Sequence, residues 1–150
     1  MKKFNNPGNI GRENGFTLIE LMAVVVIIGL LATIVGMNVA KRVEEAKIKS
    51  TKVQISQLSS ALDAFKMDNG FYPSTEQGLE SLVGEPTVGR TPKHYSSGGY
   101  LRQKSIPKDP WDNVFNYREP GTKNSDSFDI WSNGPDAQEG TEDDITNWGE

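Results

Sequence analysis

The stretch GFTLIELMAVVVIIGLLATIVGMNVA, residues 15–40, decides how the rest of the chain is organised. Glu20 is its one charged residue, and Leu21–Ala40 is twenty residues without a charge. At 1.5 Å per residue a helix of this length spans about 30 Å, the thickness of the hydrocarbon core of a bilayer. The stretch is longer than a signal-peptide core, and no small-x-small cleavage site follows it. Hydropathy alone therefore predicts a single membrane-spanning helix.

The helical pattern continues beyond this stretch. Apolar residues recur at spacings of seven, three, four and three, which places them on one helix face: Ile48, Ile55, Leu58, Leu62 and Phe65. No proline occurs between Phe16 and Asp68, whereas Asn69-Gly70 supplies a C-cap and Pro73 prevents continuation. We expect one helix of about 54 residues, about 80 Å long. Its first half is apolar all round and its second half is amphipathic.

Shorter elements are expected after the long helix. Ser74 or Thr75 can cap a short helix over residues 77–82. Residues 114–118 and 128–131 are rich in aromatic and β-branched side chains, which is typical of short strands. The remaining stretches are interpreted as turns and loops: residues 84–99, PKDPWDN at 107–113, and the acidic stretch 132–150.

Charge and composition exclude several kinds of function. The 150 residues carry a net charge of −4, and residues 124–150 contain eight acidic side chains and no basic one. Because an acidic tail repels phosphate backbones, nucleic acid is not expected as a partner. The absence of cysteine excludes disulfides, thiol catalysis and thiolate metal sites. His94 has no nucleophile motif near it, and the sequence contains no Gly-rich phosphate loop. We therefore expect that the protein is not an enzyme.

The junction at residues 15–20, Gly-Phe-Thr-Leu-Ile-Glu, follows a short basic leader and leads directly into the apolar run. In that setting it resembles the processing site of type IV prepilins and pseudopilins. The resemblance implies that a prepilin peptidase cleaves between Gly15 and Phe16 and methylates the new amine of Phe16. It also implies that Glu20 meets the Phe16 amine of an adjacent subunit during assembly. Physical chemistry agrees, since a carboxylate inside a membrane needs a partner. The alternative is that Glu20 lies near the membrane interface and snorkels.

Orientation rules and the prepilin motif point in opposite directions. Residues 1–15 contain three Lys or Arg and residues 41–52 contain five. A positive-inside count would therefore put the folded domain in the cytoplasm. In prepilins the peptidase works from the cytoplasmic side, so the motif implies the reverse. We follow the motif and expect a single-pass protein of the bacterial inner membrane with its C-terminal domain in the periplasm.

Three further stretches resemble the major pseudopilins of the type II secretion system, the general secretion pathway protein G family: DNGFYPSTEQGLESLV at 68–83, GGYLRQKSIPKDPWDNVFNY at 98–117 and DIWSNGPDAQEGTEDDITNW at 129–148. The resemblance implies an α+β, pilin-like fold, in which a long N-terminal helix packs on a small antiparallel sheet followed by a calcium-binding loop. It implies a structural subunit that assembles with copies of itself into a periplasmic pseudopilus. This filament drives folded exoproteins through the outer-membrane secretin. The implied partners are minor pseudopilins, an inner-membrane assembly platform and the prepilin peptidase.

The resemblance also implies a division of the chain into four parts. Residues 1–15 are a cleaved leader, and residues 16–40 are the transmembrane and assembly helix. Residues 41–69 are the amphipathic continuation of that helix, and residues 70–150 are the periplasmic globular region.

The resemblance implies calcium as a cofactor of the C-terminal loop. Its implied ligands are three carboxylates and two backbone oxygens: Asp136, Asp143 and Asp144, with Asn133 and Thr141. Calcium takes six to eight oxygens, so such a set with added water is chemically sufficient. The spacing is not that of an EF-hand, and Pro135-Asp136-Ala137 stands where many relatives have glycine beside the aspartate. The alternative is an acidic solvated loop without metal.

Two other functions remain open on the sequence alone. One is a type IV major pilin that forms surface fibres, although the cysteine pair usual in that class is missing. The other is a membrane-anchored calcium-binding domain.

Overall fold

The computed structural model describes residues 15–149, except for the side chains of Met37 and Asn38. The leader predicted at residues 1–15 lies outside this range apart from Gly15. In chain order the elements are helix α1 (Leu18–Asn69), the 3-10 helix η1 (Leu79–Leu82), strands β1 (Asn116–Arg118) and β2 (Asp129–Ser132), the 3-10 helix η2 (Gly134–Asp136) and strand β3 (Ile145–Thr146).

Helix α1 has 52 residues and agrees with the predicted helix within two residues at either end. At its start the Thr17 hydroxyl accepts a hydrogen bond from the Glu20 amide at 3.3 Å, and the Glu20 carboxylate accepts one from the Thr17 amide at 2.8 Å. This reciprocal pair is a capping box, which satisfies amides that a helix start leaves free. At the other end Gly70 has φ 80° and ends the helix in the left-handed region, as Asn69-Gly70 predicts.

The chain consists of two compact units that meet within α1, one ending at Lys41 and one comprising Arg42–Glu150. We call the second the C-terminal unit. In the first unit the large apolar side chains from Phe16 to Val39 are between 51% and 86% exposed. The first part of α1 is therefore apolar on all sides, as predicted, and none of its described side chains is buried in a core.

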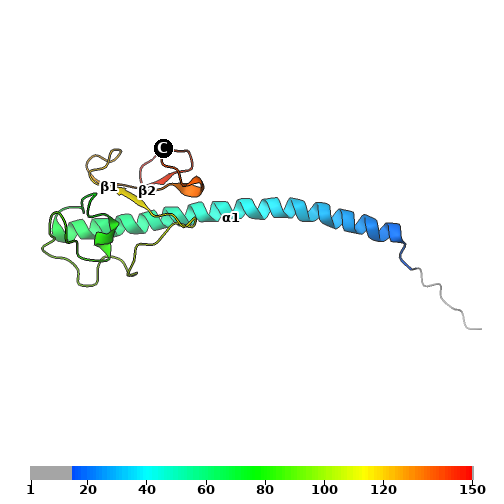
Figure 1. The fold of residues 1–150 in the computed structure, drawn as a ribbon, viewed down its shortest axis with the longest axis horizontal. Helices are drawn as coiled ribbons and strands as arrows, with labels where there is room; N and C mark the ends of the chain where they lie inside the picture. Colours follow the sequence, from blue (N-terminus) through cyan, green and yellow to red (C-terminus); the bar gives the residue numbers. More distant parts are fainter. Residues whose placement is uncertain (1–14, 150) are drawn as a thin grey trace, which may run out of the picture. The chain divides into compact units, whose positions relative to one another are not determined.

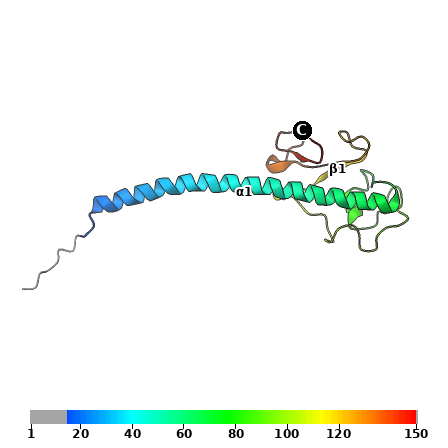
Figure 2. The same cartoon turned by 180° about the vertical axis from the view of Figure 1, so that it is seen from behind.

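The core of the C-terminal unit forms on the predicted face of α1. Ile55, Leu58, Leu62 and Phe65 are buried, and Ile48 packs against them while partly exposed. The other side of the core comes from η1 and from residues in and beside the strands: Leu79, Leu82, Phe115, Phe128, Ile130 and Ile145. The strands lie along the second half of α1, and the segment after Gly70 runs back over the same half (Figures 1 and 2). Each fully buried large apolar side chain stabilises the fold by about 1.5–3 kcal/mol.

The sheet has three antiparallel strands in the order β1-β2-β3. Trp131 of the central strand lies opposite Asn116 on one side and Thr146 on the other. Both predicted strands exist, displaced by one or two residues. The interpretation of residues 132–150 as loop only is wrong, because Ser132 ends β2 and the stretch contains η2 and β3. Strand β3 has two residues, too few for a periodic signal, and exists because it pairs with β2 and buries Ile145.

The predicted helix over residues 77–82 is also only partly correct, since a regular turn forms only at η1. The expected cap does form: the Gln77 amide donates to the Ser74 hydroxyl at 3.3 Å, and the Ser74 amide donates to the Gln77 side-chain oxygen at 3.0 Å. Gly78 then takes φ 63°, outside the helical region, and interrupts the helix at its first turn.

Candidate functional site

The predicted processing and assembly residues lie at the start of α1. Phe16 is 86% exposed, and Glu20 lies one turn into the helix. One oxygen of Glu20 accepts from both the amide and the hydroxyl of Thr17, each at 2.8 Å. Within one chain the carboxylate is thus held by Thr17 and remains exposed on the helix surface.

Gly15 has no role in the fold that would require a glycine. A Cβ added to Gly15 would meet no atom within 4 Å, and its φ is not in the left-handed region. Among the described residues 15–149, nothing requires a glycine at this position. Among residues 15–149, α1 is the one helix long and apolar enough to cross a membrane by length and composition.

The second predicted site is the C-terminal loop, by which we mean residues 133–144. Its two ends are in contact, because Gly134 has φ 64° and a Cβ there would collide with the carbonyl oxygen of Asp143. Two side chains outside the loop fix its first residues. Asn116 donates to the Asn133 side-chain oxygen at 2.7 Å, and Asn113 donates to the Gly134 carbonyl at 3.1 Å.

The carboxylates of this loop are used in different ways. Asp136 accepts from the Gln138 amide at 2.9 Å, and one oxygen of Asp144 accepts from the Gly140 amide at 2.8 Å. The other oxygen of Asp144 is buried and has no hydrogen-bond partner, whereas Asp143 is exposed. The Thr141 carbonyl already accepts from the Asp144 amide at 3.3 Å.

The structure therefore brings the predicted segments together but does not gather the three carboxylates. Nowhere in residues 15–149 do three or more Asp, Glu, His or Cys side chains lie close enough to hold a metal. The donors available are all oxygens, which suits calcium, and the orphaned oxygen of Asp144 is one that a cation would satisfy. Calcium binding at Asp144 and the full ligand set both stay predictions.

Two features of this loop could not be expected from the sequence. Arg118 and Lys123 line the same 190 Å³ cavity as Asp144, although they precede the acidic stretch in the chain. Ala137 takes φ 57°, a left-handed conformation that glycine adopts at lower cost. The alanine that stands here, where many relatives have glycine, is therefore strained.

The tertiary structure also buries two aspartates that the sequence analysis did not single out. Asp129 is 2% exposed and accepts from three consecutive backbone amides, those of residues 122–124. Asp109 is 5% exposed and accepts from Trp111, Asn113 and Ser132. The sequence contained one signal for the role of Asp109: in Asp109-Pro110-Trp111-Asp112-Asn113 an aspartate starts a turn, where its side chain typically binds backbone amides.

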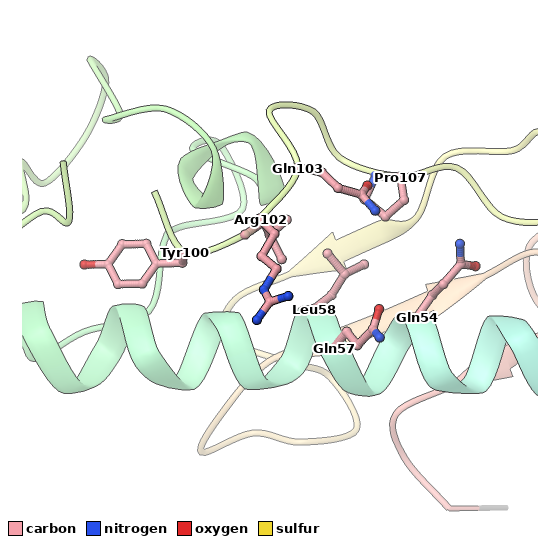
Figure 3. Close-up of a pocket in the computed structure, with 8 residues that line it drawn as sticks. Gln54, Gln57, Leu58, Tyr100, Arg102, Gln103 and Pro107 are labelled. Atoms are coloured by element: carbon pink, nitrogen blue, oxygen red, sulfur yellow. The ribbon is translucent and has the colours of Figure 1, made fainter. Parts of the chain in front are cut away.

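A groove of about 350 Å³ lies between α1 and the segment from Tyr100 to Pro107 (Figure 3). Its polar lining consists of the side chains Gln54, Gln57, Tyr100, Arg102 and Gln103. The lining contains no carboxylate, histidine or cysteine, so the groove has no acid–base pair. His94 lies exposed in a loop, as predicted.

These features define a class. A membrane-length apolar helix that continues into an amphipathic face, packed on a small antiparallel sheet, is the architecture of pilin-like subunits.

Comparison with known proteins identifies the family within this class. The family model described as type II secretion system protein G matches residues 38–148, and the prokaryotic N-terminal methylation motif matches residues 10–36.

Individual relatives agree over nearly the whole chain. The type II secretion system core protein G of Pseudomonas aeruginosa is 48% identical over 140 residues, covering 91% of this chain and 96% of that protein. The protein of the same name from Escherichia coli K12 is 46% identical over 138 residues, covering 92% of each. The crystal structure of the major pseudopilin from the type 2 secretion system of enterohaemorrhagic E. coli matches with a TM-score of 0.66 and 39% identity, covering 73% of this chain and 91% of that one. The chain belongs to the type II secretion system protein G family.

The family and the predicted packing of a long N-terminal helix on a small antiparallel sheet are thus confirmed, whereas calcium binding by the C-terminal loop stays a prediction. The cleavage site, the role of Glu20 and the calcium ligands stay predictions, as does the four-part division of the chain.

Proposed function

We propose that this chain is the major structural subunit of a type II secretion pseudopilus. Copies assemble through their N-terminal helices into a periplasmic filament that drives folded exoproteins through the outer-membrane secretin. The observation that carries this proposal is the apolar surface of residues 16–39, on which each large apolar side chain that the structure describes is at least 51% exposed. Lipid shields such a surface before assembly, and the helices of other copies shield it in the filament.

The family supports this function over the two alternatives. A type IV major pilin has the same architecture, but the protein G model and the named relatives belong to secretion systems. A membrane-anchored calcium-binding domain would leave the apolar surface with lipid as its only cover. We assign the chain a structural and not an enzymatic role, because the matched family consists of structural subunits.

Maturation follows from the N-terminal motif. A prepilin peptidase cleaves between Gly15 and Phe16 and methylates the Phe16 amine, and the match to the methylation motif supports this step. That nothing in residues 15–149 requires Gly15 to be a glycine supports it independently. The mature chain spans the inner membrane once, with its C-terminal unit in the periplasm. There the assembly platform and minor pseudopilins start the filament.

Glu20 provides the counter-charge for assembly. In a single chain Thr17 holds its carboxylate on the helix surface, where the Phe16 amine of a neighbouring copy can reach it. An ammonium beside the carboxylate removes the cost of an unpaired charge at membrane depth, about 2.5–3.5 kcal/mol at a helix centre.

The test uses the full chain expressed with its secretion system. Glu20→Ala should insert into the membrane at least as well as the parent, yet fail to form filaments or support secretion. Glu45→Ala removes an exposed carboxylate from the same helix outside the apolar stretch and should assemble normally. Normal filaments from Glu20→Ala would show that Glu20 only snorkels. An intact Met1 terminus on assembled protein, measured by mass spectrometry, would sink the maturation scheme.

We also propose that the C-terminal loop binds calcium through Asp136, Asp143 and Asp144, with backbone oxygens of Asn133 and Thr141. The support is the orphaned Asp144 oxygen and the contact between the two ends of the loop. Calcium would supply positive charge to this acidic loop and hold its ends together. Calorimetric titration should show binding that Asp144→Asn weakens, while Asp126→Asn, an exposed aspartate outside the loop, leaves binding intact. Equal binding by both variants would exclude Asp144 as a ligand.

A further inference from the structure

A buried carboxylate in the turn before the sheet has no part in the proposed function. Asp109 is 5% exposed. One oxygen accepts from the backbone amides of Trp111 at 3.0 Å and Asn113 at 2.8 Å, and the other accepts from the Ser132 hydroxyl at 2.6 Å. Burying a charge is costly unless it is fully hydrogen-bonded, and here three uncharged donors satisfy it. The effect of this carboxylate is therefore to hold its three donors in place.

On one side Asp109 holds the start of the C-terminal loop. The Ser132 oxygen that donates to Asp109 also accepts from the Gly134 amide at 3.1 Å. Asn113, whose own amide is fixed by Asp109, donates its side chain to the Gly134 carbonyl at 3.1 Å. Both backbone groups of Gly134 are therefore fixed through Asp109. Gly134 in turn lies against the Asp143 carbonyl.

On the other side the same turn is attached to α1. The Trp111 indole donates to Glu44 at 2.9 Å, and the Lys108 carbonyl accepts from the Gln54 side chain at 3.1 Å. The Lys47 ammonium lies 5.7 Å from the centre of the Trp111 ring. At 1.5 Å per residue the two attachment points are about 15 Å apart along the helix. A turn attached at two such points cannot shift without disturbing one of these contacts.

We propose that Asp109 is a positioning residue of the C-terminal loop, which it connects through Ser132, Asn113 and Trp111 to Glu44 of α1. Opening or closing of the C-terminal loop therefore changes the contact between Trp111 and Glu44 of α1, the helix through which the filament assembles. This inference rests on the proposed calcium site, because calcium is the ligand that would change the state of the loop. Opening of the loop releases Gly134, and with it the turn that holds Trp111.

The experiment measures solvent exchange of single protons by NMR on the full ¹⁵N-labelled chain in detergent micelles, with calcium or with chelator. The Gly140 amide, bonded to Asp144, reports the metal side of the loop. The Trp111 indole proton, bonded to Glu44, reports the helix side. Calcium at about a hundred times its Kd slows opening-limited exchange by about a hundredfold. In the parent chain, calcium should slow the solvent exchange of both protons by the same factor.

Asp109→Asn tests the connection without removing the side chain. Its oxygen can still accept from Trp111 and Asn113, but its amide group cannot accept from Ser132. We expect Gly140 to keep its calcium response and the response of Trp111 to fall by about tenfold, the effect of one hydrogen bond to a charged group. Ser132→Ala removes the same bond from the other partner, and with it the acceptor of the Gly134 amide. It interrupts the same connection and should lower the Trp111 response at least as much, so the test survives if one variant folds poorly.

Asp112→Asn is the matched control. It makes the same chemical change three residues away, at an exposed carboxylate that pairs with Lys108 at 2.9 Å. Asp112 has φ 70°, which asparagine tolerates well. Both protons should respond to calcium in this variant as in the parent.

The remaining outcomes overturn the inference in distinguishable ways. A parent chain in which Gly140 responds and Trp111 does not would refute the connection and leave the calcium site standing. A response at neither proton would remove the calcium site and this inference together. An equal loss at Trp111 in Asp112→Asn and Asp109→Asn would show that any disturbance of the turn suffices, and that Asp109 has no special place.

Discussion

Replacement of Phe65 by alanine should remove a large part of the stability of the C-terminal unit. Phe65 is fully buried, and its ring centre lies 5.7 Å from that of Phe71, 6.3 Å from Tyr95 and 5.2 Å from Tyr100. Truncation of a buried phenylalanine costs about 3–5 kcal/mol, and the loss of three ring contacts favours the upper end, about 4–5 kcal/mol. A domain of about 110 residues has a free energy of unfolding of only about 5–15 kcal/mol. The variant should therefore lose between about a third and nearly all of that free energy.

The assay is urea and thermal unfolding of the C-terminal unit, followed by circular dichroism. Every buried residue described lies in this unit, so we expect it to fold without residues 1–41. At about 4–8 °C per kcal/mol, a loss of about 4–5 kcal/mol should lower the Tm of Phe65→Ala by about 16–40 °C. Met67→Ala, two residues on and 85% exposed, should change the free energy of unfolding by less than about 0.5 kcal/mol. Equal midpoints for the two variants would refute the packing of this helix face against the rest of the unit.

Three further predictions concern the C-terminal unit. Calcium at about a hundred times its Kd should raise the free energy of unfolding by about 2.7 kcal/mol and Tm by about 10 °C or more. Magnesium should substitute poorly, and the double variant Asp143→Ala with Asp144→Ala should lose the response; identical melting curves with calcium and chelator would leave only an acidic loop. Ala137→Gly should stabilise by about 0.5–1 kcal/mol because φ is 57°, whereas Ala46→Gly in exposed helix should destabilise by about 1 kcal/mol; a loss in both would contradict strain at the loop. Burial raises the pKa of the Tyr117 hydroxyl. Because its pKa in the folded state exceeds the unfolded value, this contribution to stability is complete below about pH 10 and is lost as pH rises further. Tyr117→Phe should flatten the fall of Tm with pH in that range, and parallel curves for parent and variant would contradict the assignment.

Helix α1 could be predicted because every signal for it is local in the sequence. An apolar run of membrane length, one apolar face in register and a stop at Asn69-Gly70 each act within a few residues. Strand β3 could not be predicted, since two residues have no period to read. Its existence depends on β2, which lies more than ten residues away in the chain. The helix expected over residues 77–82 forms only from Leu79 onward for a local reason, the positive φ of Gly78.

Of the two candidate sites, one could be predicted from local sequence and the other depends on tertiary contacts. The residues of the processing motif are consecutive, so the sequence shows them together and the structure keeps them at one helix end. The environment of the C-terminal loop depends on contacts made across the fold. Only the tertiary structure shows that Gly134 meets Asp143, or that Lys123 shares a cavity with Asp144. An aspartate that is buried and one that is solvated look alike in sequence, which is why Asp109 was missed.

Different parts of α1 pack in the core and present an exposed apolar surface, and this explains how one helix can lie in a membrane and also assemble into a filament. All buried residues described, from Thr51 onward, lie in the C-terminal unit, and the apolar residues before Lys41 contribute none. Folding of the C-terminal unit therefore does not use the surface that assembly requires. A subunit can exchange lipid for the helices of its neighbours along that surface without repacking its core. It follows that substitutions should separate cleanly: changes at Glu20 impair assembly and leave Tm unaltered, while changes at Phe65 lower Tm and leave membrane insertion intact.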